Sequence, residues 1–168
     1  MARKGFEHLI TGRTAKLPGD LKRHAPVEPC PNGTIRVVIP GPTPGKPRMT
    51  QRDRWKKRPA VVRYRDWCDR VRGIIVNAVT LPDPSTVMEL NWVAYFEPPT
   101  SWAKKRRALA VGELHRQRPD RDNIDKAILD CLWPSSDSAI AAGRIEKRWD
   151  WNSRLEIEIV IDRAQLKE

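Results

Sequence analysis

Apolar residues recur at helical spacing in two parts of the chain. From 60 to 79 they return every three or four positions, which is the period of one helix face, and the segment from 122 to 132 repeats that spacing. Pro134 ends the second pattern. A shorter helix is expected over 104 to 109, with Ser101 as its N-cap. The pattern therefore predicts three helices, of which the first is the longest.

Four other segments have the composition or the alternation of β-strands. β-branched and aromatic residues fill 34 to 40 and 86 to 96, and both runs are bounded by proline or glycine. Apolar and polar residues alternate over 144 to 151 and 155 to 161 around the turn-prone pair Asn152-Ser153, which predicts a β-hairpin. The expected order is β-α-β-α-α-β-β. This order predicts an α+β or mixed α/β fold, with a small mixed sheet packed by helices.

The chain of 168 residues is long enough for one compact domain plus at most a tail. Residues 1 to 33 are rich in Gly and Pro and have little periodicity, so they are expected to form a flexible basic arm before a domain over 34 to 168. This arm has no apolar run long enough for a secretory signal, and a cytoplasmic location is expected. Three cysteines without CxxC spacing argue against a disulfide framework and against a zinc site.

The charge of the chain is strongly positive and unevenly distributed. Lys and Arg outnumber Asp and Glu by 32 to 21, which gives a net charge of +11. The segment from 46 to 72 carries +8 and that from 104 to 118 carries +5, whereas 119 to 142 carries −3. A basic excess of this size favours a polyanion such as nucleic acid as the partner. No apolar run approaches the roughly 20 residues of a membrane span.

The +8 segment begins with a dense run of cations in a predicted loop that also contains Trp55. Cations on a loop can follow a phosphate backbone, and an aromatic ring beside them, such as that of Trp55 or Trp102, can stack on unpaired bases. The alternative is a solvated loop with one anchoring tryptophan. A membrane surface is disfavoured because the loop lacks an apolar face. The candidate DNA-binding residues are Lys46, Arg48, Arg52, Arg54, Lys56, Lys57, Arg58, Lys104, Lys105, Arg106, Arg107 and Arg118.

The −3 segment contains a cluster of carboxylates that suits a hard cation. Asp120 and Asp122 stand at the expected start of a helix, and Lys126 lies four residues after Asp122 on the same face. Acids also favour a helix start through the macrodipole, so a purely structural role is the alternative. Mg²⁺ prefers oxygen ligands and is commonly held by one or two carboxylates together with substrate phosphates. Asp137 lies beyond the helix, where a return of the chain would bring it opposite the pair.

The residues around this cluster resemble a known family. The pattern consists of Arg118-Pro119-Asp120-x-Asp122-Asn123-x-x-Lys126, then Asp130, Asp137-x-x-Ile140 and Lys147. Upstream stand a strand with the Pro/Gly-rich segment 40 to 48, then Tyr64-Arg65-x-Trp67 and Ser101-Trp102 before a Lys/Arg run. Over about residues 34 to 161 the chain resembles the RusA family of phage-type Holliday junction resolvases.

This resemblance implies a homodimeric, Mg²⁺-dependent endonuclease that makes paired nicks across a four-way DNA junction during recombination and repair. Mn²⁺ is the expected substitute, and the cytoplasm of a bacterial or phage-infected host cell is the expected location. By position, Asp120, Asp122 and Asp137 match the family's metal-binding carboxylates, and Lys126 matches its essential lysine. Asp130 is expected to be a structural partner of Lys126.

Two departures from the family pattern keep other functions open. The family usually has an Asp-Asp pair where this chain has Ser136-Asp137, and its loop after the helix is usually longer than the segment from 133 to 136. The alternatives are a non-catalytic DNA-binding protein and a related nuclease that acts on flaps, forks or branched phage DNA. Asn123 is expected to cap or brace the helix start, and His115 is left out of the catalytic set.

Overall fold

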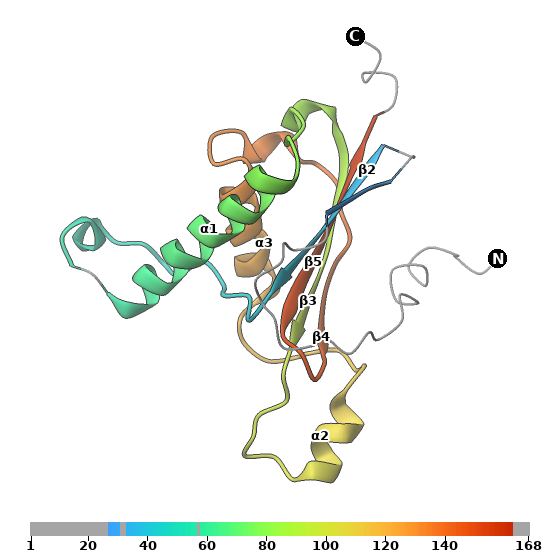
Figure 1. The fold of residues 1–168 in the computed structure, drawn as a ribbon. Helices are drawn as coiled ribbons and strands as arrows, with labels where there is room; N and C mark the ends of the chain where they lie inside the picture. The colour runs from blue at the N-terminus through green and yellow to red at the C-terminus, as the bar shows by residue number, and fades with distance from the viewer. Residues whose placement is uncertain (1–26, 31–32, 57, 163–168) are drawn as a thin grey trace.

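The computed structural model describes residues 27–30, 33–56 and 58–162, which form a five-stranded sheet with two long helices on one face (Figure 1). The strands are β1 (Val27–Cys30), β2 (Thr34–Pro40), β3 (Val87–Phe96), β4 (Ile145–Trp149) and β5 (Arg154–Ile161), and the helices are α1 (Pro59–Ala78), α2 (Lys104–Ala110) and α3 (Arg121–Leu132). The strand order is β1-β2-β5-β3-β4, with β3 and β4 parallel and the other neighbours antiparallel. The prediction of an α+β fold with a small mixed sheet is confirmed.

Local sequence patterns place most elements correctly. The bounds of α1 and α3 lie within one residue of those predicted, and β2 and β3 match the two β-branched runs. α1 begins with Pro59 at its first turn, where the missing N–H of proline costs no helical hydrogen bond. These elements follow from periodicity and end signals alone.

The predicted hairpin of 144 to 151 with 155 to 161 is wrong, because β3 lies between β4 and β5. Ala94 of β3 faces Lys147 of β4 on one side and Leu155 of β5 on the other. The turn at Asn152-Ser153 carries the chain past the end of β3, whose Phe96 carbonyl accepts a hydrogen bond from the Asp150 amide at 2.9 Å. β3 is buried from Leu90 to Tyr95, as is typical of a central strand. The alternation of apolar and polar residues in β4 and β5 does not indicate that another strand lies between them.

Two further predictions, one for the segment before β2 and one for the start of α2, differ from the structure. Residues 27–30 form the edge strand β1 within the segment expected as a flexible arm, while residues 1–26 and 31–32 lie outside the described part of the chain. Ser101 is not the N-cap of α2, because a turn closed by the Trp102 amide on the Pro99 carbonyl precedes the helix and Ala103 takes the cap position. Figure 1 shows α2 projecting beyond the end of the sheet.

The core lies between the sheet and the buried faces of α1 and α3. Ile124 and Ile128 of α3 are 0% and 1% exposed and pack in one cluster with side chains of α1, β2, β3 and β5. Burial of each such side chain stabilises the fold by roughly 1.5 to 3 kcal/mol. A Cβ on Gly143 would lie 2.0 Å from the Leu90 carbonyl oxygen, so only glycine allows the chain before β4 to approach β3 this closely. α3 is therefore fixed on the sheet by apolar packing.

Candidate functional site

The start of α3 presents two carboxylates to solvent. Asp120 is the N-cap residue and Asp122 lies in the first turn, and both are exposed. Aspartate at this position commonly accepts a hydrogen bond from the helix start. The Asp120 side chain makes no such capping bond within the described residues. Its carboxylate is therefore available for another ligand, at the end of the helix where the macrodipole favours negative charge.

Lys126 lies one turn further along the exposed face of α3. Its Nζ is 3.7 Å from Oδ2 of Asp122, and the two side chains are 61% and 67% exposed. An exposed pair at this spacing contributes little to stability, with typical values below about 1 kcal/mol. The Lys126 ammonium group can therefore leave Asp122 for a phosphate at little cost.

The sequence predicts that Asp130 pairs with Lys126, but in the structure Asp130 pairs with Lys46. Its Oδ2 lies 2.6 Å from Nζ of Lys46 and accepts a hydrogen bond of 2.9 Å from the hydroxyl group of Tyr64. Burial and this contact with Asp130 raise the pKa of Tyr64, which remains a donor. The Asp130 carboxylate therefore binds the Lys46 ammonium group and not that of Lys126, because the loop after β2 passes over α3.

This loop is held directly against the start of α3. The Lys46 amide donates to the Asn123 carbonyl at 2.8 Å. A Cβ on Gly45 would lie 2.9 Å from Cβ of Pro119 and 3.2 Å from Cβ of Asn123, so the close approach depends on glycine. The expected bracing role of Asn123 is thus carried by its backbone carbonyl, which fixes the basic loop beside the two acids.

Lys147 binds the segment that leads into the start of α3. It lies on β4 opposite Ala94, whose side chain points to the helix-covered face of the sheet. Its Nζ donates to the Gln117 carbonyl at 2.6 Å and to the Pro119 carbonyl at 2.7 Å. Burial lowers the pKa of Lys147, and the charge of Asp120 opposes that effect. From the sequence, Lys147 could be identified only as one position of the family pattern. Its contacts could not be predicted, because they depend on pairing between strands that lie far apart in the chain.

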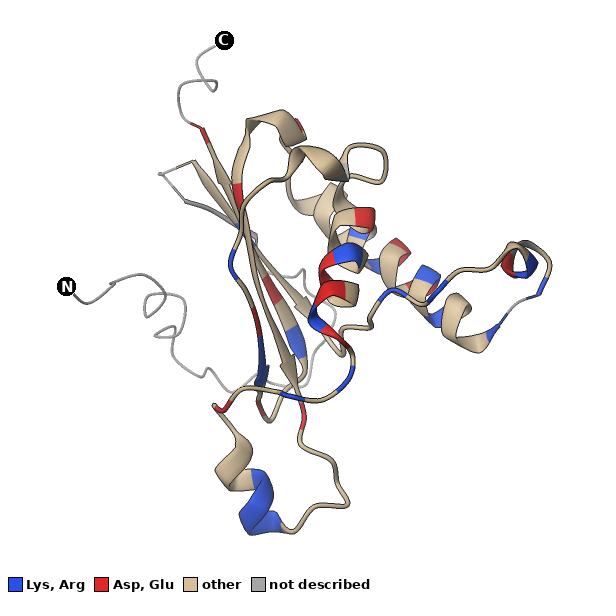
Figure 2. Ribbon diagram, turned by 180° about the vertical axis from the view of Figure 1, so that it is seen from behind, with Lys and Arg blue, Asp and Glu red and all other residues tan. Residues whose placement is uncertain are grey.

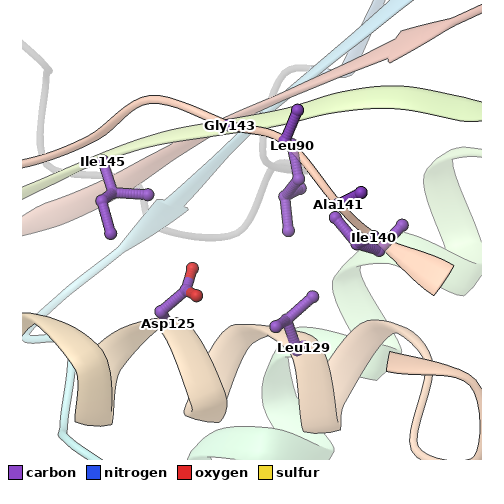
Figure 3. Close-up of a pocket in the computed structure, with 8 residues that line it drawn as sticks. Leu90, Asp125, Leu129, Ile140, Ala141, Gly143 and Ile145 are labelled. Carbon is purple, nitrogen blue, oxygen red and sulfur yellow. The ribbon is translucent and has the colours of Figure 1, made fainter. Parts of the chain in front are cut away.

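Asp125 points the other way, into the fold. Its Oδ1 accepts a hydrogen bond of 2.8 Å from Nε1 of Trp92 on β3. Figure 3 shows its carboxylate facing a cavity of about 140 Å³, with Leu129 of the same helix beside it and Leu90 and Ile145 on the opposite side. Asp125 therefore serves the packing of α3 on the sheet and is separate from the exposed acids.

Asp137 lies at the far end of α3 from the other two predicted metal ligands. Its backbone belongs to the short 3-10 helix η4 (Asp137–Ala139), which contacts η3 (Pro84–Thr86) before the start of β3. The 12 residues of α3 span roughly 18 Å at about 1.5 Å each. Lys147, which holds the Asp120 loop, pairs with Ala94 near the opposite end of β3. Within one chain, the structure does not bring the backbone of Asp137 to the exposed pair.

The donor set fits a hard cation only in part. Asp120 and Asp122 offer carboxylate oxygens, which Mg²⁺ and similar ions prefer. In the part of the chain that the structure describes, no three Asp, Glu, His or Cys side chains are grouped so that they could hold one metal ion. With two carboxylates, the remaining ligands of such an ion would be water, substrate phosphate or an acid from elsewhere.

Apart from Arg118, which lies two residues before Asp120, the candidate DNA-binding residues form two separate groups. One lies on the loop between β2 and α1 and the other on α2, and the start of α3 lies between them (Figures 1 and 2). Arg48, Arg52, Lys56, Lys104, Lys105, Arg106 and Arg118 are exposed, and Arg107 is half-buried. Lys46 and Arg58 instead form ion pairs with Asp130 and Asp53. Lys57 and the side chains of Arg54 and Asp137 lie outside the described part of the structure.

Two carboxylates at a helix start between two cationic projections have the chemistry expected for binding a polyanion together with a hard cation. Residues 44–160 match the family model described as Endodeoxyribonuclease RusA. The match covers most of the chain, which therefore belongs to the RusA family of Holliday junction resolving endodeoxyribonucleases. No curated protein matches the chain. None of the described helices is long and apolar enough to cross a membrane.

His115 is buried beside the loop that leads to Asp120, and its environment predicts a pH-dependent stability. The ring is 5% exposed and lies 4.2 Å from the ring of Phe96 and 4.1 Å from that of Trp149. Its Nδ1 has no hydrogen-bond partner within the described residues. Burial and the charge of Lys147 lower the pKa of His115 from 6.5 to about 4. A phosphate contact is excluded for so enclosed a ring.

The unfolded chain binds a proton at His115 near pH 6.5, whereas the folded chain does so only near pH 4. Folding stability therefore falls as the pH drops through that window. We expect the free energy of unfolding, measured by urea denaturation, to lose on the order of 2 kcal/mol more in the wild type than in His115→Phe between pH 7.5 and pH 4.5. Equal losses in the two proteins would contradict a buried neutral His115.

Lys147→Met removes both hydrogen bonds to the loop that carries Asp120. Because the start of α3 then loses a fixed position, we expect DNA cleavage to fall by about 10- to 100-fold and the metal concentration for half-maximal activity to rise. DNA binding without metal should change little. Lys147→Arg, which keeps donors and charge, should recover part of the activity. An activity loss explained entirely by a lower melting temperature would argue against this positioning role.

Proposed function

We propose that the protein resolves four-way DNA junctions by Mg²⁺-dependent hydrolysis of phosphodiester bonds, with paired nicks, in DNA recombination and repair. The observation that carries the proposal is the exposed pair Asp120 and Asp122 at the start of α3, in a chain of the RusA family. Asp120 makes no capping bond in the described structure, which favours a ligand role over a structural one.

Asp120 and Asp122 would hold the divalent cation, Mg²⁺ or Mn²⁺. When bound, this ion supplies a polarised phosphoryl oxygen and a bound water of lowered pKa. Lys126 stands one turn from Asp122 with a weak ion pair, so its ammonium group can approach the negative charge that develops on the phosphate. Arg118, exposed two residues before Asp120, is suited to hold the DNA backbone beside the acids.

The distribution of charge supports a DNA substrate in particular. Two carboxylates alone repel a phosphodiester, so the site depends on cations nearby. The loop after β2 and α2 supply them on either side of α3 (Figure 2). Lys46 and Arg58, whose charges are already paired, hold this loop in place, whereas the exposed Arg48, Arg52 and Lys56 are free to follow a phosphate backbone.

A homodimer resolves the distance between Asp137 and the exposed pair. Since η4 and the start of α3 lie at opposite ends of one helix, a two-fold axis can bring Asp137 of one chain to Asp120 and Asp122 of the other. Two identical sites then form, related by the same symmetry as a four-way junction. This arrangement accounts for paired nicks and for the incomplete donor set of a single chain.

Asp122→Asn tests the chemistry. The substitution removes a charged ligand but keeps the size of the side chain, so we expect junction binding to persist while Mg²⁺-dependent cleavage falls by more than about 100-fold. The measurement uses purified protein with a synthetic four-way junction, a flap, a fork and a linear duplex, with and without Mg²⁺. Asp69→Asn, an exposed acid on α1, is the matched control and should cleave normally.

Full cleavage by Asp122→Asn would rule out this mechanism. Binding without nicks in the wild type under any divalent metal would instead favour a non-catalytic DNA-binding protein. Stronger cleavage of flaps or forks than of junctions would make the protein a related branched-DNA nuclease.

A mixed dimer tests whether the two chains share each site. Asp122→Asn and Asp137→Asn should each be inactive as homodimers. If Asp137 acts across the dimer, the heterodimer has one site with both substitutions and one with neither, so single-strand nicking returns at about half the wild-type number of sites. Co-expression with two different tags allows its purification. A heterodimer as inactive as its parents would show that each site comes from one chain.

A further inference from the structure

The loop between β2 and α1 exposes a tryptophan to solvent. Trp55 is 85% exposed, the highest value among the large hydrophobic side chains of the described residues. A single exposed apolar residue is common, but a tryptophan left in water forgoes more burial than any other side chain. The contacts of the residues around Trp55 therefore indicate whether the fold holds this side chain in solvent.

A buried carboxylate braces this loop. Asp53 is 5% exposed, and its Oδ2 accepts hydrogen bonds from the Thr50 amide at 2.6 Å and from the Thr50 hydroxyl group at 3.0 Å. Arg58 adds two more, from Nε to Oδ1 at 2.5 Å and from Nη2 to Oδ2 at 2.6 Å. The Arg58 guanidinium holds the pKa of Asp53 at about 2. A two-point Arg–carboxylate pair of this kind fixes geometry as well as charge.

The same arginine closes the loop. Nη2 of Arg58 also donates to the Arg48 carbonyl at 2.7 Å, which joins the two sides. At the tip, the amides of Trp55 and Lys56 both donate to the Arg52 carbonyl, at 3.0 and 2.8 Å. The turn that carries Trp55 is thus held by hydrogen bonds of residues before and after it in the chain. Its exposed position is built into the fold.

The base of the loop lies at the candidate active site. The Lys46 amide and ammonium group contact Asn123 and Asp130 of α3, so the base of the loop is attached to this helix at two points. From there the loop extends beyond the first turn of α1, away from the sheet (Figure 1). A molecule that contacts both the acids and the loop tip therefore has to extend well outside the site.

The surroundings of Trp55 identify the chemistry of its partner. Arg52 and Lys56 flank it and are exposed, as is Arg48 at the base. An apolar pocket on another protein would have to desolvate these cations beside the indole. A nucleic acid strand offers phosphates for the cations and flat base faces for the ring. Stacked bases inside a duplex present no free face, whereas an opened strand crossover leaves the bases at its centre without a stacking neighbour on one side.

We propose that Trp55 stacks on an unstacked base at the crossover of branched DNA. The proposal rests on the function proposed above and specifies how that function distinguishes a junction from a duplex. The brace formed by Thr50, Asp53 and Arg58 fixes the backbone that carries the ring, so the loop loses little conformational entropy on binding.

A cycle of protein and DNA changes tests this contact. Binding is measured in EDTA, where no cleavage occurs, for the wild type, Trp55→Ala, Trp55→Phe and the control Val76→Ala, an exposed apolar residue on α1. The DNAs are a four-way junction, the same junction with single abasic sites at the crossover, and a linear duplex. We expect Trp55→Ala to lose about 10-fold in junction affinity and nothing in duplex affinity, with Trp55→Phe close to the wild type.

The abasic junctions identify the base. At the stacked position, loss of the base should weaken wild-type binding by a similar factor and leave Trp55→Ala unaffected, because the two changes remove one contact. An unchanged junction affinity in Trp55→Ala, an equal loss on duplex, or conversion of a dimer to a monomer would overturn the proposal. In each case a wild type that still cleaves junctions with Mg²⁺ leaves the proposed function standing, whereas a wild type that binds junctions no better than duplex overturns both.

Discussion

Burial of one face of α3 is the constraint on which the site depends. Ile124, Ala127 and Ile128 are almost fully enclosed against the sheet, and Trp92 adds a hydrogen bond to Asp125 on the same side. With 3.6 residues per turn, a helix held in this way has to turn Asp122 and Lys126 outward. The apolar core thus determines which charged residues meet solvent, and a slip of α3 would cost both packing and the position of the acids.

Two lysines then fix the start of this helix from opposite sides. The Lys46 amide contacts Asn123 from the loop after β2, while the Lys46 ammonium group pairs with Asp130 further along α3, and Lys147 contacts the residues before the helix from β4. Both donate to groups on the protein, a carboxylate and backbone carbonyls, so they neutralise local negative charge without occupying the exposed acids. Part of the basic excess therefore serves the internal structure, whereas the exposed cations of the loop tip and of α2, together with Arg118 and Lys126, face solvent.

How much of this could be predicted from the sequence depends on the range of the interaction. The periodicity of α1 and α3 and the strand composition of β2 and β3 are local, and both are confirmed. The position of β3 between β4 and β5 and the contacts of Lys147 depend on pairing between distant segments, which alternation does not encode. For the same reason Asp130 binds Lys46, which is 84 residues away in sequence, and not the lysine one turn before it.

The separation of Asp137 from the exposed pair has a consequence for control of the reaction. In the proposed dimer, a lone chain lacks a complete donor set, so it cannot nick DNA while unassembled. Assembly creates two complete sites at once, and the symmetry that creates them also sets their spacing on the two-fold junction. An enzyme with a full set of acids in each chain would have no such restriction and could leave single, unmatched nicks. In the proposed dimer, the placement of η4 at the far end of α3 would thus link the chemistry at one phosphodiester to the shape of the whole substrate.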